Sequence, residues 1–275
     1  MDIDLVYLWV DGNDAVWQAK RNACIGRPEE NSAVNCEGRY ANNDELKYSL
    51  RSIEKYAPWI RHIFIVTDNQ VPVWLDTANP KIRIIDHTEI VPRECLPCFN
   101  SSLLEHFLYK IPGLSEYFLY ANDDMFVNKP VTQTTFFAED GLPLIRLNRR
   151  PFRKLALLFK EKILGKQLSN YNRIIQNAAK LVERRFGIYY SGKAHHNIDS
   201  YLKSHYRHTE QMFDNEIRLT YSNHVRSAND IQRSLFSYVA LAERQAHLCY
   251  VTQKTSCRLH IDNEGNYGKV ERYDP

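Results

Sequence analysis

Two adjacent carboxylates follow an apolar run near the middle of the chain. The run from Tyr117 to Ala121 is typical of a buried strand, and Asn122, Asp123 and Asp124 come directly after it. Such residues must lie at the rim of a sheet, which is where open α/β folds bind their ligands. Paired carboxylates at a rim suit a hard divalent cation that carries substrate phosphates. The alternative is a helix cap or a solvated turn, where Asn and Asp are also common.

The first half of the chain alternates between predicted strands and helices. Asp11, Asp68 and Asp123 each follow a predicted strand, so in a parallel sheet all three lie on the same rim. This pattern predicts an α/β fold with a mainly parallel, Rossmann-like sheet. The expected strands are 3–10, 60–67, 82–85 and 117–121, the helices are 44–56 and 101–109, and a long loop is expected at 17–42.

Beyond about residue 150 the pattern becomes mainly helical. We therefore divide the chain into an α/β core, residues 1–150, and a mainly helical part, residues 151–275, which together form one unit. The expected helices of the second part are 152–164, 169–185, 197–206, 208–217 and 228–246.

The composition is that of an ordinary globular protein. The 275 residues are 44% hydrophobic and 25% charged, enough for one large domain or for one domain with an appended lobe. No run of about 18 apolar residues predicts a membrane span. The chain starts on an acidic segment that leads directly into a strand, so we expect no signal peptide. Together with only six cysteines, this indicates a cytoplasmic protein with reduced thiols.

Cys95 and Cys98 have the spacing of a redox or zinc pair. A second such pair, which would complete a four-cysteine zinc site, is missing from the sequence, and no predicted helix starts at Cys98. Packing in the core is the favoured interpretation of both thiols.

Positive charge is concentrated in one segment. Between Arg146 and Arg185, twelve Lys or Arg residues accompany only two acids, although the formal net charge of the chain is +3. Within this segment, residues 152–164 combine helical spacing of apolar residues with basic flanks. Such a helix is typical of a membrane surface or another anionic partner, and the alternative is a helix with its apolar side in the core. No nucleic-acid-binding motif accompanies the segment, so we expect no nucleic-acid partner.

Four ordered blocks of the sequence resemble the Stealth family of hexose-1-phosphate transferases. This family includes bacterial capsular and exopolysaccharide phosphotransferases and the animal lysosomal-enzyme N-acetylglucosamine-1-phosphotransferase. The resemblance covers about residues 2–245, which is far more specific than one short motif. The first block is 4–12; the second is 43–67, continued at 70–75, 100–105 and 122–124; the weaker third is 186–187 with 194–195, and the fourth is 225–227 with 230–238.

Two positions depart from the pattern of the family. His195 is followed by His196 instead of by a nearby proline, so the histidine of the third block is either His195 or His196. Cys98 stands where relatives tend to have threonine, which favours the packing interpretation of that thiol.

The resemblance implies a GT-A-like fold in which residues 1–150 bind a nucleotide sugar and residues 151–275 complete the active site. It implies a UDP-hexose or UDP-N-acetylhexosamine donor and a divalent cation, Mg²⁺ or Mn²⁺. A hydroxyl of the acceptor sugar attacks the β-phosphorus, UMP leaves, and a sugar-1-phosphate diester forms with the anomeric configuration of the donor retained. The expected setting is the synthesis of capsular or other cell-surface polysaccharide in a bacterium.

The same resemblance implies roles for individual residues. Asp123 and Asp124 would hold the cation, which neutralises charge on the diphosphate. His195 is the expected general base, with His196 as the alternative. Arg226 would contact phosphoryl oxygens through its guanidinium fork. The other expected catalytic residues are Asp11 and Glu105, and the expected substrate-binding residues are Trp9, Gly12, Asn43, Arg51, Thr67, Asp68 and Asn122.

Two other classes of protein fit parts of this pattern. A glycosyltransferase of the same fold would transfer the sugar itself and release UDP, and carboxylates at strand ends do not distinguish the two reactions. A non-catalytic carbohydrate- or lipid-binding module could use the basic helix as its interface, but it would not need the acids, histidine and arginine. The expected acceptor is a glycan, free or lipid-linked; in the membrane-surface interpretation, residues 152–164 contact the inner face of the cell membrane.

Overall fold

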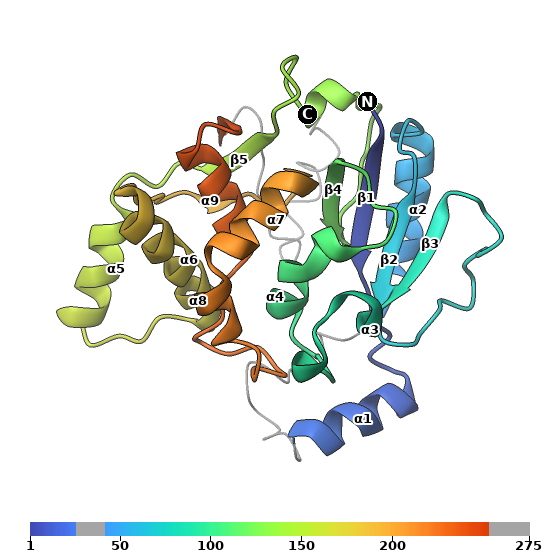
Figure 1. The fold of residues 1–275 in the computed structure, drawn as a ribbon, viewed down its shortest axis with the longest axis horizontal. Coiled ribbons are helices and arrows are strands. Elements are labelled where there is room, and N and C mark those ends of the chain that lie inside the picture. Colours follow the sequence, from blue (N-terminus) through green and yellow to red (C-terminus); the bar gives the residue numbers. More distant parts are fainter. Residues whose placement is uncertain (26–41, 253–275) are drawn as a thin grey trace, which may run out of the picture.

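The computed structural model of the chain describes residues 1–25 and 42–252 (Figure 1). The strands of this part are β1 (Ile3–Leu8), β2 (Ile63–Thr67), β3 (Ile82–Asp86), β4 (Tyr117–Asn122), β5 (Leu144–Asn148), β6 (Lys193–Ala194), β7 (Asp199–Leu202) and β8 (His247–Val251). Its helices are α1 (Ala15–Ile25), α2 (Glu45–Tyr56), α3 (His87–Ile90), α4 (Ser101–Leu104), α5 (Arg153–Lys162), α6 (Asn170–Phe186), α7 (Lys203–Met212), α8 (Asp214–Arg218) and α9 (Ser234–Ala242), with 3₁₀ turns η2 (Arg93–Cys95), η3 (Glu105–Lys110) and η4 (Gln133–Thr135).

Five strands form the main sheet in the order β3-β2-β1-β4-β7. β1 pairs in parallel with both β2 and β4, β3 continues in parallel beyond β2, and β7 pairs antiparallel with β4. The predicted α/β class with a mainly parallel sheet is therefore confirmed. Because the chain moves outward to β2 and β3 and then returns to the other side of β1, the carboxyl ends of β1 and β4 flank a topological switch point. Open α/β sheets bind their ligands at such points.

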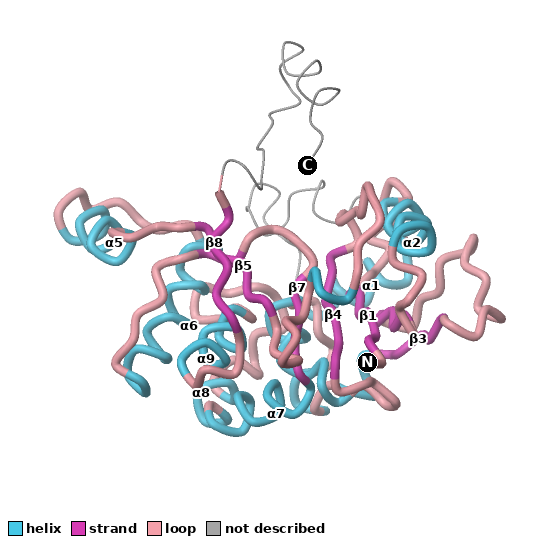
Figure 2. The backbone as a smooth tube through the Cα atoms, turned by 90° about the horizontal axis from the view of Figure 1, so that it is seen from above, coloured by secondary structure: helices cyan, strands magenta, loops and turns pink. Residues whose placement is uncertain are grey.

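Helices cover both faces of this sheet, with α2 on one side and α7 and α9 on the other (Figure 2). The strands β1, β2 and β4 are therefore buried on both faces, which explains their continuous apolar runs. Leu5 and Tyr7 of β1 belong to the core cluster that contains Ile53 of α2, whereas Val6 belongs to the cluster that contains Phe236 of α9.

The second half of the chain contributes strands as well as helices. β7 completes the main sheet, and β5 pairs with β6 and β8 in a second sheet of three strands. The helix predicted at 197–206 was wrong over its first part, because Asp199–Leu202 is β7 and α7 begins only at Lys203. The ring of Tyr201 stacks on Phe118 of β4 at 5.5 Å, so pairing with a distant strand overrides the local preference of these residues.

The loop predicted at 17–42 was wrong in its first part, where α1 is a helix. The side chain of Asp14 accepts hydrogen bonds from the backbone N–H groups of Val16 (2.7 Å) and Trp17 (3.3 Å), which satisfies two donors at the helix start. Trp17 is buried and packs edge-to-face on Phe99 at 5.4 Å. The later part of the predicted loop, residues 26–41, lies outside the described residues.

The packing interpretation of the cysteine pair is confirmed. Cys95 and Cys98 are free thiols in the core, and burial raises the pKa of both to about 12. Thiols with so high a pKa are poor nucleophiles and poor metal ligands at neutral pH.

Candidate active site

A cavity of about 610 Å³ opens at the switch point, where β1 and β4 end. Its wall also includes residues of α3, α4 and α6 and the segments 194–196 and 226–233. The cavity therefore collects side chains from parts of the chain that are far apart in sequence. The predicted site residues that line it are Trp9, Glu105, Asn122, Asp123, His195, His196 and Arg226.

The acid pair lies at the end of β4. Burial and the neighbouring Asp124 raise the pKa of Asp123 to about 6, whereas contact with a histidine lowers the pKa of Asp124. The turn after the pair is held from α2, because the Ser49 hydroxyl donates a hydrogen bond to the carbonyl oxygen of Met125 (2.5 Å). Asp123 is therefore partly enclosed at the cavity wall, and Asp124 is more exposed beside it.

The two adjacent histidines lie between β6 and β7, opposite the acid pair. His196 Nε2 is 3.5 Å from Asp124 Oδ2, and this contact raises the pKa of His196. Burial, and then the neighbouring His196, lower the pKa of His195. The backbone N–H of His195 donates to the carbonyl oxygen of Arg146 (3.1 Å), which ties this segment to β5. His195 is thus the imidazole that is more readily neutral, and only a neutral imidazole can accept a proton.

Arg226 reaches the cavity from a loop that is tied to α4. Its Nη2 donates a hydrogen bond to Ser101 Oγ (2.6 Å). Behind it, the buried Asn100 donates through Nδ2 to Asp230 Oδ2 (2.9 Å), and the backbone N–H of Ser227 donates to the same oxygen (2.7 Å). Because Asn100 and Asp230 are buried and satisfied, this network fixes the loop and thereby the guanidinium.

Glu105 lines the cavity but is held in a buried ion-pair network. Its Oε1 accepts hydrogen bonds from Arg233 Nη1 and from the Tyr120 hydroxyl, both at 3.1 Å. Arg233 also donates to Asp199 Oδ2 at the start of β7, through Nη2 at 2.8 Å. Burial opposes the charge of Arg233, but the Glu105 and Asp199 carboxylates raise its pKa well above the usual value. Since Asp199 follows His196 by only three residues, the network also anchors the histidine segment.

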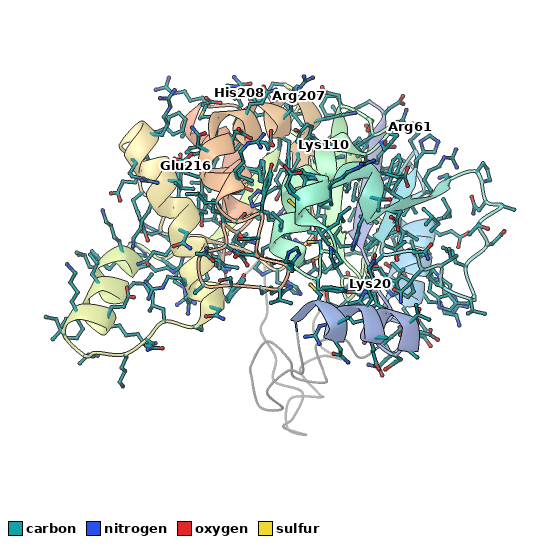
Figure 3. The ribbon with its side chains drawn as sticks, turned by 60° about the horizontal axis from the view of Figure 1, so that its bottom comes forward. Lys20, Arg61, Lys110, Arg207, His208 and Glu216 are labelled. Carbon is teal, nitrogen blue, oxygen red and sulfur yellow. The ribbon has the colours of Figure 1, made fainter. Side chains whose placement is uncertain are left out.

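The ends of β1 and β2 lie on the same rim as Asp123, as predicted from the strand ends. The backbone N–H of Asp11 donates to Gln70 Oε1 (2.8 Å). Asp68 pairs at 2.5 Å with Lys20 of α1, which is labelled in Figure 3. His87 Nδ1 is 4.0 Å from Asp68 Oδ1, and burial lowers the pKa of His87 to about 4. Of these residues only His87 lines the cavity, so Asp11 and Asp68 support its rim.

The other predicted substrate-binding residues lie outside the cavity wall. Gly12 and Thr67 are buried near the ends of β1 and β2. Asn43 donates through its side-chain amide to Glu45 Oε1 (3.0 Å) at the start of α2. Arg51 is exposed on α2, with its guanidinium carbon 5.8 Å from the ring centroid of Tyr48.

Sequence reasoning missed Arg233 and His87 as residues of the cavity wall. The available signal was a charged residue directly before a long apolar run, since Arg233 precedes the fully buried start of α9. A buried arginine must be paired with a carboxylate. The resemblance to the Stealth family already covered this position, in the block 230–238. For His87 the sequence offered no comparable signal.

A divalent cation fits the acid pair when substrate phosphates complete its coordination. Within residues 1–25 and 42–252 no three His, Cys, Asp or Glu side chains form a group that could hold an ion by themselves. Asp123 and Asp124 supply two carboxylates, and a bound cation would offset the burial and the neighbouring Asp124 that raise the pKa of Asp123. Mg²⁺ is typically bound by one or two carboxylates together with phosphate oxygens and water, which matches this donor set.

Comparison with known proteins identifies the family of this α/β chain. Residues 1–27 match the family model of Stealth protein conserved region 1, and residues 39–145 match that of conserved region 2. The chain belongs to the Stealth family, as its sequence blocks predicted. The two matched regions carry β1, β4 and the acid pair, and residues of β1 and β4 together with Asp123 line one side of the cavity.

Curated relatives of the chain bear the names of phosphotransferases. An exopolysaccharide phosphotransferase of Lactiplantibacillus plantarum is 49% identical over 142 residues, which are 52% of this chain and 41% of that protein. A capsular polysaccharide phosphotransferase of Neisseria meningitidis is 34% identical over 236 residues, which are 85% of this chain and 63% of that protein. The chain thus spans less than two thirds of the length of these relatives.

The likeness to solved structures is remote. The Mn/GDP form of core-mannan synthase A from Aspergillus fumigatus has a TM-score of 0.46 at 11% identity, covering 90% of this chain and 72% of that protein. The bifunctional glycosyltransferase WbbM in its apo form has a TM-score of 0.39 at 10% identity, covering 92% of this chain and 46% of that protein.

Proposed function

We propose that the chain is the catalytic part of a phosphotransferase of polysaccharide synthesis, which moves a sugar-1-phosphate from a UDP-sugar to a sugar hydroxyl and releases UMP. The observation that carries this proposal is the cavity itself, in which Asp123, His195 and Arg226 converge from three distant segments. The names of the relatives support the class of reaction. The setting is bacterial capsule or exopolysaccharide synthesis.

A nucleotide sugar suits the size and the walls of this cavity. Its volume, about 610 Å³, lies within the range of small-molecule sites. Trp9, Trp17 and Phe99 line it and offer apolar surface for a base and ribose, whereas Arg226, and a cation held at Asp123, would face a diphosphate. The donor would therefore lie across the switch point, with its phosphates near the end of β4.

The proposed step is an attack on phosphorus. The acceptor hydroxyl loses its proton to His195 while its oxygen forms a bond to the β-phosphorus of the donor. The bond between that phosphorus and the bridging oxygen breaks, and UMP leaves with the electron pair. The C1–O bond of the sugar stays intact. A Mg²⁺ or Mn²⁺ ion bound by Asp123 and Asp124 would neutralise charge on the phosphates when present.

The remaining residues orient these groups. Arg226 would hold phosphoryl oxygens through its fork, because a guanidinium matches phosphate geometry. Arg233, pinned between Glu105 and Asp199, would keep the histidine segment in place. Asp124 would serve both the cation and His196, which lies 3.5 Å from it.

A screen of UDP-hexoses and UDP-N-acetylhexosamines with Mg²⁺ or Mn²⁺ tests the proposal, with UMP and UDP separated by chromatography. We expect UMP, in larger amounts when a sugar acceptor is present, and no product from the Asp124→Asn variant. Release of UDP would instead identify a glycosyltransferase. Binding of a glycan without turnover of any donor would identify a binding module.

A further inference from the structure

Helix α5 places an apolar stripe on the surface of the molecule. It lies at the edge of the fold, beyond α6, in both Figure 1 and Figure 2. The exposed fractions of its large apolar residues decide between the two interpretations of this segment. They are 65% for Leu155 and 55% for Phe159 in the helix, and 74% for Phe152 and 68% for Ile163 directly beside it, so most of the apolar side is exposed and only Leu157 is buried in the core.

The opposite side of α5 is the one attached to the protein. Leu157 and Arg153 are buried. Lys154 forms an ion pair with Glu183 of α6, and Glu161 forms one with Arg173 of α6. The contacts with α6 therefore neutralise Glu161, which is the sole acid of α5. They leave the apolar stripe exposed to solvent.

Two lysines border the stripe. At about 100° per residue, Phe152, Leu155, Phe159 and Ile163 fall within an arc of about 80°. By the same count Lys160 lies on one side of this arc and Lys162 on the other, each about 80° from Phe152. Long basic side chains on both borders of an apolar stripe can reach the headgroups of a lipid layer while the stripe enters it.

We propose that α5 docks the protein in the plane of an anionic membrane surface. The stripe would enter the boundary between headgroups and acyl chains, and Lys160, Lys162 and the exposed Arg149 and Arg150 beside the helix would face anionic headgroups. An anionic lipid surface is the favoured partner because the exposed side of α5 carries lysines and no acid. The inference does not depend on the reaction proposed above, because none of these residues lines the cavity.

Sedimentation with vesicles of phosphatidylglycerol and of phosphatidylcholine at low salt tests the proposal. The parent chain should bind the anionic vesicles, and about 0.5 M salt should weaken this binding because it screens charge. Leu155→Ser with Phe159→Ser and Ile163→Ser should weaken binding by more than about 100-fold, since each side chain loses its burial in lipid. Lys160→Gln with Lys162→Gln should weaken it by roughly 30-fold, at about 1 kcal/mol for each charge.

A matched control carries Val73→Ser, Leu219→Ser and Arg207→Gln, three exposed residues that are not part of α5. It should bind as the parent does, and all variants should keep the parent melting temperature because none of the changed side chains is buried. The proposal is overturned if the parent does not bind anionic vesicles, if it binds neutral vesicles equally well, or if the α5 variants bind as the parent. A dimer of the parent that the serine variant abolishes, without vesicle binding, would show that a second copy covers the stripe instead.

Discussion

At the scale of single residues, the two neighbouring histidines differ in their environment. Burial and His196 lower the pKa of His195, whereas Asp124 raises the pKa of His196. His195 can therefore accept a proton at neutral pH, while His196 is the better partner for a carboxylate. This difference in pKa supports His195 as the base of the proposed reaction and assigns His196 to the acid pair.

His195→Ala should lower kcat by about 10²-fold or more while leaving the affinity for the donor unchanged. With decreasing pH, kcat/KM of the parent should fall as His195 becomes protonated, with a midpoint below the ordinary value of 6.5. UMP release and donor titration measure both effects. His196→Ala is the control. If His196→Ala is inactive and His195→Ala is active, the general base is His196.

The role of the acid pair can also be tested through the melting temperature, without measuring turnover. Folded Asp123 keeps its proton up to about pH 6, whereas the unfolded carboxyl loses it near 3.8. The folded chain therefore binds more protons in this interval, and this group destabilises the cation-free protein as the pH rises through it. Asp123→Asn should raise the melting temperature at about pH 7.5 more than at about pH 4. Mn²⁺ with a UDP-sugar should raise the melting temperature of the parent but not of Asp123→Asn.

Chelation is the complementary experiment for the acid pair. Asp124→Asn and excess EDTA should each abolish UMP release, and both should leave the circular dichroism spectrum unchanged because Asp124 is exposed. Full turnover in EDTA would show that the pair acts without a cation.

At the scale of elements, Glu105 of η3 connects three segments that form the cavity wall. It pairs with Arg233, which in turn holds β7 through Asp199, while the Tyr120 hydroxyl of β4 donates to the same carboxylate. Its geometry is that of a positioning residue, because its Oε1 accepts hydrogen bonds from both Arg233 and Tyr120.

Glu105→Gln should destabilise the chain by about 3 kcal/mol, because it leaves Arg233 buried with one of its two carboxylates removed. Urea unfolding measures this loss, and Glu94→Gln, at an exposed acid, should change stability by less than about 0.5 kcal/mol. Unchanged stability with lost turnover would mean that Glu105 acts directly on the substrate.

At the scale of the whole molecule, the two halves of the chain share one core. Phe118 of β4 packs against Tyr201 of β7 and Tyr206 of α7, and Tyr206 stacks on Phe236 of α9 at 3.6 Å. Without the second half, β4 would become an exposed edge strand with an uncovered apolar face. The α/β part is thus completed by the part that follows it.

Residues 1–150 alone should therefore fail to unfold cooperatively. Near-ultraviolet circular dichroism during heating should show a sharp transition for the full chain and a broad or absent one for the fragment. A sharp transition of the fragment would mean that the first half folds independently and that the shared core is not required.

The sequence alone determined the parallel strands and the rim on which Asp11, Asp68 and Asp123 lie. Each of these features depends on residues that are neighbours in the chain. An apolar run with polar residues at its end predicts a buried strand that ends at the rim of a sheet, whatever the rest of the fold. The same local signals located α2 and α6 to within a few residues. The family blocks added the residues of the candidate site, and the structure brings His195 and Arg226 to the cavity wall beside Asp123.

Features that arise from contacts between distant parts of the chain became apparent only in the tertiary structure. β7 is a strand because β4 lies beside it, and Glu105 is engaged because Arg233, 128 residues further along, reaches it. The stripe on α5 shows the limit most clearly. Its apolar spacing predicts one face to be buried, but spacing within a helix cannot tell which side the rest of the chain will cover. The ion pairs of Lys154 and Glu161 with α6 hold the other side of α5 against the protein, so the stripe faces the solvent.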